Sequence, residues 1–201
     1  MEKKELELYI HIPFCVRKCN YCDFLSFPAD EDTQRQYVKA LCKEIFYYGA
    51  HCRDYVVSTV YIGGGTPSWL WESDMAEIMD AVHKNFALLP DAEVSVECNP
   101  GTVTAQKFAV YRQSGINRIS LGLQSAQNVE LKMLGRIHTW EQFLKTYELA
   151  RAGGFSNINV DLMSSLPGQH TATYADSLQK VCRLKPEHIS AYSLIIEEGT
   201  P

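Results

Sequence analysis

Short apolar runs alternate along the chain with longer segments in which apolar residues recur every three or four positions. The longer segments have helical periodicity, as Tyr37, Leu41, Ile45 and Tyr48 show within residues 33–48. The short runs are bounded by turn-forming residues, a pattern typical of buried strands. The pattern predicts six strands, at residues 6–12, 56–62, 93–97, 117–123, 157–163 and 188–194.

Helices are predicted between these strands, at residues 33–48, 72–86, 104–114, 128–134, 140–152 and 171–184. Ser68 and Ser73 are candidate N-terminal caps for the second helix, and Gly115 suits the C-terminal cap of the third. Regular alternation of strands and helices predicts parallel strands joined by right-handed crossovers. The fold class is therefore α/β.

Two architectures fit this alternation, a doubly wound sheet and a barrel-like wrap. The unusual residues favour the barrel, because the cysteine loop, the glycine run, Glu97, Gln124 and Asp161 all stand at the carboxyl ends of predicted strands. Barrel enzymes gather their chemistry at that face, whereas a doubly wound sheet concentrates it at one switch point. We expect one domain over residues 1–201, a partial (β/α)6 TIM-like barrel of parallel strands. The chain stops in the loop after the sixth strand, so we expect it to lack a C-terminal domain.

Composition narrows the function classes. The chain has 201 residues, of which 46% are hydrophobic, and a formal charge of -5, so it can bury one sizeable core and shows no basic footprint for nucleic acid. Its longest apolar runs are too short to span a bilayer, and the first five residues contain no apolar segment of the signal-peptide type. We therefore expect a cytoplasmic location. The seven cysteines do not have the spacing of a secreted disulfide framework.

Three of those cysteines, Cys15, Cys19 and Cys22, lie in one short loop directly after the first predicted strand. An iron–sulfur cube has four irons, and ordinary electron carriers bind all four through thiolates. Three protein ligands leave one iron open, as catalytic metal sites keep a free position. Zinc is the alternative metal, and His11 could supply its fourth ligand. The ligand count favours a [4Fe-4S] cluster.

A glycine run, Gly63, Gly64 and Gly65, follows the second predicted strand and continues into Thr66 and Pro67. Consecutive glycines allow positive φ and a close approach of backbone to a ligand. The run is not a phosphate-binding loop, because the Lys-Ser/Thr ending of such loops is missing. A tight turn into a helix would explain it equally well on its own. Its position one strand after the cysteine loop favours ligand binding.

Together these residues carry a resemblance to a known family. The segment Tyr9-Ile-His-Ile-Pro-Phe-Cys15-x3-Cys19-x-Tyr21-Cys22 resembles the start of a radical S-adenosylmethionine (SAM) domain. Further matches cover essentially the whole chain and indicate the oxygen-independent coproporphyrinogen III oxidase family, including its haem-chaperone (HemW-type) branch. They are Gly63-Gly-Gly-Thr-Pro67, Val94-Ser-Val-Glu97-Cys-Asn-Pro100, Ile116-Asn-Arg118-Ile-Ser-Leu-Gly-Leu-Gln124-Ser125, Leu134-Gly-Arg136-Ile-His138, Asn157-Ile-Asn-Val-Asp161-Leu-Met163, Leu166-Pro-Gly-Gln169 and Ile189-Ser-Ala-Tyr192-Ser-Leu194.

The resemblance implies a radical SAM barrel whose cofactors are a [4Fe-4S] cluster on Cys15, Cys19 and Cys22 and SAM on the open iron. An electron from the cluster then cleaves the SAM sulfonium to give methionine and a 5′-deoxyadenosyl radical. Carboxylates suit the ribose hydroxyls and amino group of SAM, and an arginine suits its carboxylate. The SAM-binding residues implied by the family motif are Tyr9, Tyr21, Gly64, Gly65, Thr66, Glu97, Gln124, Arg136 and Asp161.

Two functions remain open within this family. One is oxidative decarboxylation of coproporphyrinogen propionates by a dehydrogenase-type oxidoreductase, and the other is a haem chaperone that receives haem and hands it on. The decarboxylating enzymes typically carry a fourth cysteine two positions after the third, where this chain has Phe24 after Asp23. They also usually have a longer arm before the residue matching Tyr9. Both departures favour the chaperone, and no catalytic residue is assigned.

The resemblance also implies partners. They are SAM, haem or coproporphyrinogen, an electron donor of the flavodoxin or ferredoxin type, and a haem acceptor, free or membrane-associated. Two residues depart from the family pattern: Ser165 stands where glycine is usual, and Ala126 where an aromatic residue is usual. Ser165 adds a side chain where the backbone is expected to pass closely.

Overall fold

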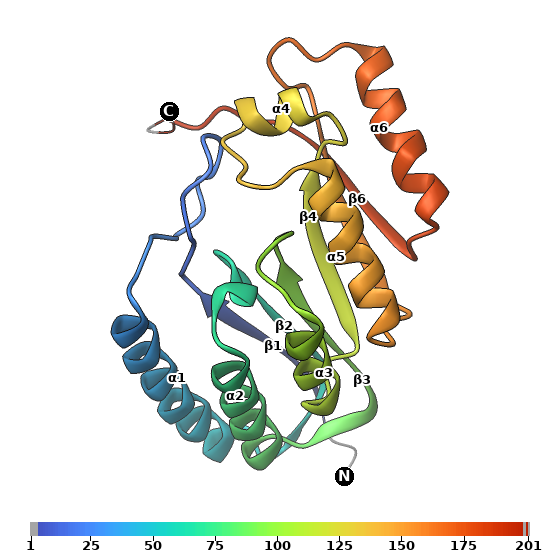
Figure 1. Cartoon of the computed structure of the whole chain (residues 1–201). Helices are drawn as coiled ribbons and strands as arrows, with labels where there is room; N and C mark the ends of the chain where they lie inside the picture. The colour runs from blue at the N-terminus through green and yellow to red at the C-terminus, as the bar shows by residue number, and fades with distance from the viewer. Residues whose placement is uncertain (1–3, 199, 201) are drawn as a thin grey trace.

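The computed structural model describes residues 4–198 and 200. Strands and helices alternate along this part of the chain, as the hydrophobic pattern predicts (Figure 1). The strands are β1 (Lys4–Ile12), β2 (Tyr55–Gly64), β3 (Leu88–Cys98), β4 (Arg118–Gln124), β5 (Ile158–Ser164) and β6 (His188–Ser193). The helices are α1 (Glu31–His51), the short 3-10 helix η1 (Pro67–Trp69), α2 (Glu72–Asn85), α3 (Ala105–Gln113), α4 (Asn128–Met133), α5 (Trp140–Ala152) and α6 (Thr171–Leu184).

All six strands belong to one sheet, whose spatial order is the chain order from β1 to β6. Every neighbouring pair is parallel. A doubly wound sheet would change direction at a switch point, so the sequential order confirms the predicted barrel-like wrap. Within the described residues β1 and β6 are not paired, and the curled sheet is therefore a half-barrel with an open side. Consequently all six strands point their carboxyl ends toward the same edge.

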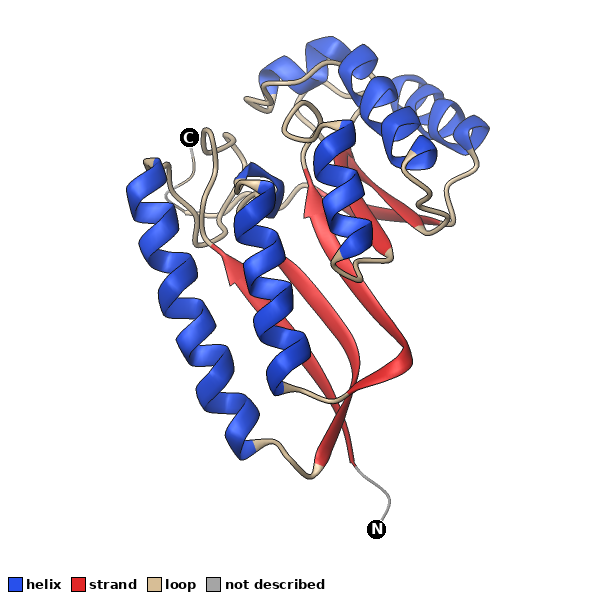
Figure 2. Cartoon of the chain, turned by 60° about the horizontal axis from the view of Figure 1, so that its bottom comes forward, coloured by secondary structure: helices blue, strands red, loops and turns tan. Residues whose placement is uncertain are grey.

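The longer helices lie along the outer face of the curled sheet (Figure 2). The main core fills the layer between these helices and the sheet. The helices contribute large buried side chains to this layer, among them Ile78, Phe108 and Phe143. From the sheet, side chains such as Ile62 and Val96 point outward into the same layer and are fully buried. In the described part of the chain, no helix is long and apolar enough to cross a membrane. The cytoplasmic location stays a prediction.

The helix ends show where local sequence sets the structure. Thr104 caps α3 by accepting a hydrogen bond from the backbone of Lys107, and Gly115 follows that helix with φ of 88°, as predicted for a C-terminal glycine. The prediction of a serine cap on α2 is wrong, because Trp71 occupies the cap position without a side-chain bond. Ser68 instead hydrogen-bonds to Thr102 in the loop after β3.

The start of β3 differs from the prediction, and the backbone at Ser165 explains a feature of the sequence. β3 begins at Leu88, five residues before the predicted start, because Leu88 pairs with Val57 of β2 through an irregular register. Ser165, directly after β5, has φ of 61°, a left-handed conformation that favours glycine. That backbone requirement accounts for the usual glycine at this position, and here a serine meets it.

Candidate functional site

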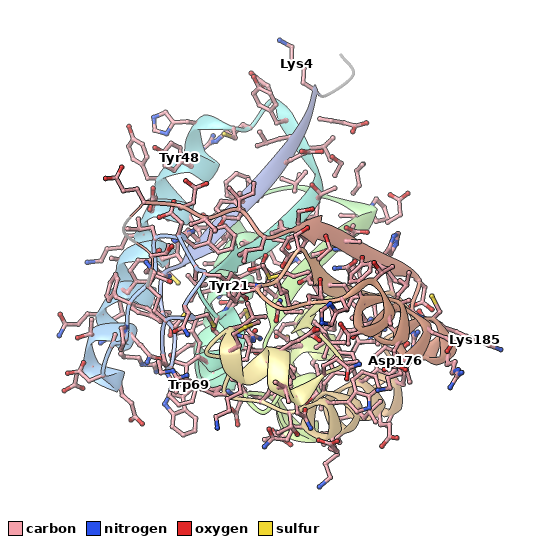
Figure 3. All side chains as sticks on the ribbon, turned by 90° about the horizontal axis from the view of Figure 1, so that it is seen from above. Lys4, Tyr21, Tyr48, Trp69, Asp176 and Lys185 are labelled. Atoms are coloured by element: carbon pink, nitrogen blue, oxygen red, sulfur yellow. The ribbon has the colours of Figure 1, made fainter. Side chains whose placement is uncertain are left out.

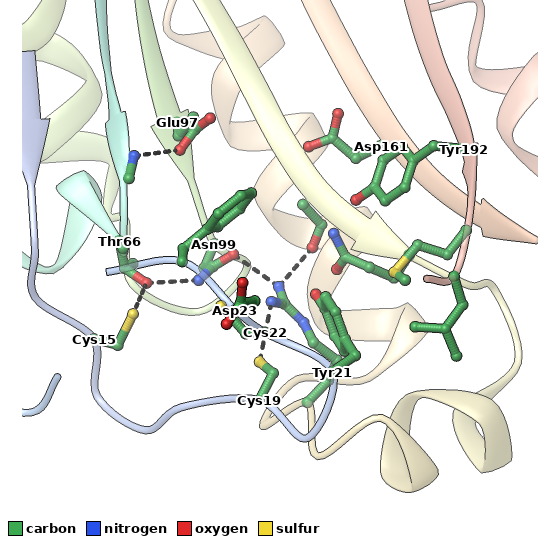
Figure 4. A pocket seen from close by; sticks show the side chains of 18 of the residues that line it. Cys15, Cys19, Tyr21, Cys22, Asp23, Thr66, Glu97, Asn99, Asp161 and Tyr192 are labelled. Atoms are coloured by element: carbon green, nitrogen blue, oxygen red, sulfur yellow. Dashed lines mark hydrogen bonds between the residues drawn. The ribbon is translucent and has the colours of Figure 1, made fainter. Parts of the chain in front are cut away.

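The carboxyl ends of the strands surround a cavity of about 390 Å³. Its walls come from the cysteine loop, the glycine run after β2 and the ends of β3 to β6 (Figure 4). Seen from above, Tyr21 lies near the middle of the molecule, whereas Trp69 and Asp176 lie toward its edge (Figure 3). Eight of the nine predicted SAM-binding residues line this cavity, together with all three clustered cysteines. These eight are Tyr21, Gly64, Gly65, Thr66, Glu97, Gln124, Arg136 and Asp161.

Tyr9 is the ninth predicted residue, and it is not among the described residues that line the cavity. Its hydroxyl lies 2.9 Å from His11 Nδ1, and its ring stacks on that of Tyr61 with 6.3 Å between centroids. Tyr61 in turn donates a hydrogen bond to Glu97. Tyr9 is therefore one side chain away from a carboxylate that lines the cavity, and its binding of SAM stays a prediction.

The cysteine loop is fixed to the barrel at several points. His11 Nε2 lies 2.9 Å from the carbonyl oxygen of Leu25, so His11 helps to orient the loop through this hydrogen bond. Asn20, between the second and third cysteines, donates from its backbone to the carbonyl of Leu134 and from its side chain to that of Met133, both at 3.0 Å. These last carbonyls of α4 would otherwise lack intrahelical partners. The loop thus satisfies a helix end while it holds the cysteines in place.

The zinc alternative finds no support in this geometry. Both ring nitrogens of His11 are engaged by Tyr9 and Leu25, which leaves no free nitrogen for a fourth ligand. In residues 4–198 and 200, no three His, Cys, Asp or Glu side chains converge as ligands of one metal ion. An iron–sulfur cube does not require such convergence, because each cysteine binds a different iron.

Two of the cysteines receive hydrogen bonds from the cavity wall. Thr66 Oγ1 donates to Cys15 Sγ at 3.4 Å, and Arg136 Nη1 donates to Cys19 Sγ at 3.6 Å (Figure 4). Burial raises the pKa of the third thiol, Cys22, above its ordinary value. Donors and a cationic side chain beside thiols stabilise thiolates. The donor set therefore fits a cluster held by three cysteine thiolates.

The glycine run has no room for side chains. Gly64 has φ of 116°, and a Cβ there would lie 2.5 Å from the ring of His11. A Cβ on Gly65 would lie 2.7 Å from the carbonyl oxygen of Phe14. The backbone N–H of Gly64 donates to Glu97 Oε2 at 3.0 Å. The glycine run therefore packs its backbone closely against the protein and orients a carboxylate, while its approach to a ligand stays a prediction.

Two carboxylates face the cavity, and burial weakens the acidity of both. Glu97 accepts from Tyr61 and Gly64, yet burial still raises its pKa. Asp161 accepts from Asn159 Nδ2 at 2.7 Å, and burial raises its pKa to about 6. A ligand that offers hydroxyl or ammonium donors would compensate these buried oxygens.

Arg136 and Gln124 contribute polar atoms to the same wall. Arg136 Nη2 donates to Asn99 Oδ1 and to the carbonyl of Gly122, each at 2.7 Å. Arg136 Nε and Gln124 Oε1 are buried and have no hydrogen-bond partner among the described residues. Buried polar atoms without partners are uncommon in native structures and often mark a ligand position. These two atoms fit a polar ligand such as SAM, whereas both terminal nitrogens of the arginine donate to protein atoms.

Sequence reasoning missed several residues of this wall. Asn99 connects Arg136 to Thr66, Tyr61 holds Glu97, and Tyr192 at the end of β6 lines the cavity. Asn99 stands two positions after Glu97 at the same strand end, which is the signal that could have found it. Tyr61 carries no such signal, because it lies within its strand. Cys98 lines the cavity but is 2% exposed, and burial raises its pKa to about 12.

Comparison with known families agrees with this geometry. The model of the Radical SAM superfamily matches residues 9–181. The chain belongs to the radical SAM superfamily. This superfamily implies a [4Fe-4S] cluster and SAM, which the three cysteines and the cavity fit.

Curated proteins similar to this chain include the heme chaperones HemW of Escherichia coli and Haemophilus influenzae. The first is 41% identical over 97% of this chain and 52% of its own length. The second is 38% identical, over 97% of this chain and 52% of its own length. The chain thus spans about half the length of the curated relatives it matches. Among solved structures, coproporphyrinogen III oxidase (HemN) of Escherichia coli, a radical SAM enzyme, matches with a TM-score of 0.90 and 28% identity over 100% of this chain and 49% of that one.

Proposed function

We propose that this chain forms the cofactor-binding core of a haem chaperone. It holds a [4Fe-4S] cluster through Cys15, Cys19 and Cys22 and binds SAM in the adjoining cavity. The observation that carries the cofactor assignment is the meeting of all three cysteines and eight predicted SAM-binding residues around one cavity. Haem reception is supported by the similarity to heme chaperones HemW and by Phe24 in place of a fourth cysteine.

In this proposal the protein binds and orients its cofactors, which together supply radical chemistry when bound. Glu97 and Asp161 accept hydrogen bonds from the hydroxyl and amino groups of SAM. The unpartnered Arg136 Nε and Gln124 Oε1 complete the polar contacts. Burial of these groups excludes water and strengthens each interaction.

A second candidate is oxidative decarboxylation of coproporphyrinogen, and the TM-score of 0.90 to HemN favours it. Phe24 argues against it, because the sequence motif of the decarboxylating enzymes has cysteine there. Phe24 lines the cavity with 66% of its surface exposed, so an apolar ring lies where the decarboxylating enzymes have a thiol.

In the chaperone, a flavodoxin-type or ferredoxin-type protein is the proposed electron donor, and a free or membrane-associated protein is the proposed haem acceptor.

The cofactor assignment is tested first by anaerobic reconstitution with iron and sulfide. The wild-type chain is expected to gain about four irons per chain with the charge-transfer absorbance of a [4Fe-4S] cluster. Cys19→Ala is expected to lose the intact cluster, whereas Cys182→Ala, at an exposed free cysteine on α6, is expected to load like wild type. Equal loading of all three proteins would contradict the ligand role of the cysteine loop.

The tetrapyrrole assignment is tested separately on the reconstituted protein. Haem and coproporphyrinogen are each added with SAM and dithionite, and binding, carboxyl loss and 5′-deoxyadenosine release are measured. The chaperone proposal expects haem to bind with its propionates intact. Decarboxylation of coproporphyrinogen with stoichiometric 5′-deoxyadenosine would replace it with the second candidate. Absence of haem binding by a fully loaded cluster protein would also contradict it for this chain.

A further inference from the structure

Asn99 holds a fixed place directly after β3, where its backbone is tied on both sides. Its N–H donates to Ser68 Oγ at 3.1 Å, and its carbonyl accepts from Thr102 Oγ1 at 2.8 Å. Lys107 Nζ donates to the carbonyls of Ser68 and Thr102 from the rear, at 2.9 and 3.1 Å. This buried lysine joins the loops that follow β2 and β3, so the position of Asn99 is set from outside the cavity.

The side chain of Asn99 connects two donors that contact different cysteines. Its Nδ2 donates to Thr66 Oγ1 at 2.8 Å, and its Oδ1 accepts from Arg136 Nη2 at 2.7 Å (Figure 4). Thr66 donates onward to Cys15 Sγ, and Arg136 donates onward to Cys19 Sγ. One asparagine is therefore a single hydrogen bond away from the donors on two of the three cysteines.

The direction of these bonds matters. A threonine hydroxyl has one proton, and Asn99 approaches Thr66 Oγ1 as a donor, which leaves that proton free to point at Cys15. Hydrogen bonds in such a chain strengthen one another. The amide oxygen of Asn99 likewise fixes one arm of the Arg136 guanidinium, so that the other arm remains at Cys19. Without Asn99, the Thr66 hydroxyl could rotate away from Cys15, and Arg136 Nη2 would be held by the carbonyl of Gly122 alone.

We propose that Asn99 is a positioning residue that directs the hydrogen bonds of Thr66 and Arg136 onto the sulfurs of Cys15 and Cys19, and thereby raises the reduction potential of the cluster. This inference rests on the proposed cluster. Hydrogen bonds to ligand sulfurs stabilise the reduced cluster, which carries one more negative charge, and outer partners of this kind tune a metal centre. Asn99 touches no ligand sulfur itself, so its effect is transmitted through Thr66 and Arg136.

The experiment compares four reconstituted proteins: wild type, Asn99→Ala, Thr66→Val and the double variant. Iron and sulfide content is measured first, and the midpoint potential is then measured without SAM by titration followed with electron paramagnetic resonance. We expect Asn99→Ala to lower the midpoint potential by ~59 mV, which is about a tenfold lower ratio of reduced to oxidised cluster at a fixed potential for one electron. We also expect Asn99→Ala to have a smaller effect in the Thr66→Val background, because one of its two routes is already lost.

Asn117→Ala is the matched control. Asn117 also bridges two partners through its amide, with Nδ2 on the carbonyl of Ala92 and Oδ1 on the N–H of Val94, but it lies before β4, at the opposite end of the strands. It is expected to lose stability without a change in potential. If Asn99→Ala does not fold, the isosteric Asn99→Asp replaces it, because a carboxylate cannot donate to Thr66. The added negative charge of Asn99→Asp lowers the midpoint potential equally with and without the Thr66 hydroxyl. A smaller effect of Asn99→Asp in the Thr66→Val background therefore reports only the loss of the donor to Thr66.

The outcomes separate this inference from the proposed function. A wild-type chain that gains no cluster would overturn the proposed function. A loaded wild type with an unchanged potential in the loaded Asn99 variant would overturn the positioning role alone. An Asn99 effect of the same size with and without the Thr66 hydroxyl would also overturn it, since no energy would then pass through Thr66.

Discussion

The hydroxyl of Tyr61 donates a hydrogen bond to Glu97 Oε1 at 2.7 Å, across the step from β2 to β3. Tyr9 on β1 stacks on the Tyr61 ring, so three neighbouring strands contribute to the placement of one carboxylate. The other oxygen of Glu97 is held by the backbone of Gly64. Glu97 therefore faces the cavity in an orientation set by the protein before any ligand binds, which lowers the entropy lost on binding.

Tyr61→Phe is expected to destabilise the fold by about 1.5–3 kcal/mol at pH 8, because Glu97 loses a hydrogen bond to a charged oxygen. The variant should also raise the pKa of Glu97 further, since the Tyr61 bond opposes the effect of burial. Stability is measured by chemical denaturation. Affinity for SAM, measured on the reconstituted protein, is also expected to fall, because Glu97 is then oriented by the Gly64 backbone alone.

Tyr111→Phe is the matched control for that loss. The Tyr111 ring is fully buried in α3, and its hydroxyl has no hydrogen-bond partner among the described residues. Removing an unpaired buried hydroxyl is expected to leave the free energy of unfolding unchanged or to raise it slightly. Equal losses in the two variants would show that the bond to Glu97 contributes nothing specific.

Gly64→Ala is expected to destabilise the protein by about 3 kcal/mol or more, because the positive φ of residue 64 disfavours a side chain and a Cβ there would clash with the His11 ring. Gly154→Ala separates these effects, because Gly154 also has a positive φ, 84°, yet a Cβ there meets nothing within 4 Å. We expect about 1 kcal/mol for Gly154→Ala, the backbone contribution alone. A similar loss in both variants would show that the approach of His11 to Gly64 exerts no steric restriction.

The sequence predicted the parallel strands of the barrel and the gathering of unusual residues at their carboxyl ends, because the signals that mark a strand end are local. The glycines after β2 and Asn99-Pro100 after β3 mark strand ends, and parallel strands bring such ends together at one edge. Asn99 itself was passed over because its role depends on Thr66 and Arg136, 33 and 37 residues distant.

The wrong predictions have the same origin. Ser68 was assigned to a helix cap because serine before a helix is a local signal, whereas its actual partners lie after β3. The first five residues of β3 were missed because they include Pro90, a residue that usually interrupts strands. In each case a contact distant in sequence decides the outcome.

Ser165→Gly is expected to stabilise the protein by about 0.5–1 kcal/mol, because Ser165 holds a left-handed φ of 61° that glycine adopts without strain. Greater freedom of glycine in the unfolded chain reduces this gain but does not reverse it. Ser164→Gly, at the neighbouring position within β5, is expected to destabilise instead, since that residue is in a strand. Thermal unfolding of the two variants should therefore move in opposite directions.

Asp161 should make the stability of the fold depend on pH. Burial raises its pKa from 3.8 to about 6 on folding, so the folded chain binds this proton more tightly than the unfolded chain. Its contribution to the free energy of unfolding is therefore highest below pH 4 and is lost as the pH rises through about 6. The loss amounts to about 3 kcal/mol if the whole shift is realised. A neutral isostere at position 161 should not lose stability in this way as the pH rises.

Asp161→Asn tests this directly, because its amide oxygen can still accept from Asn159 while no charge forms. The difference in free energy of unfolding between variant and wild type is expected to grow in favour of the variant between pH 4 and pH 6 and to level off above. Asp176→Asn is the control, since the bonds from Lys180 and Gln127 lower the pKa of Asp176 and give the opposite sign. A flat difference for Asp161→Asn would mean that its carboxylate is as well solvated folded as unfolded, and that a ligand need not neutralise it.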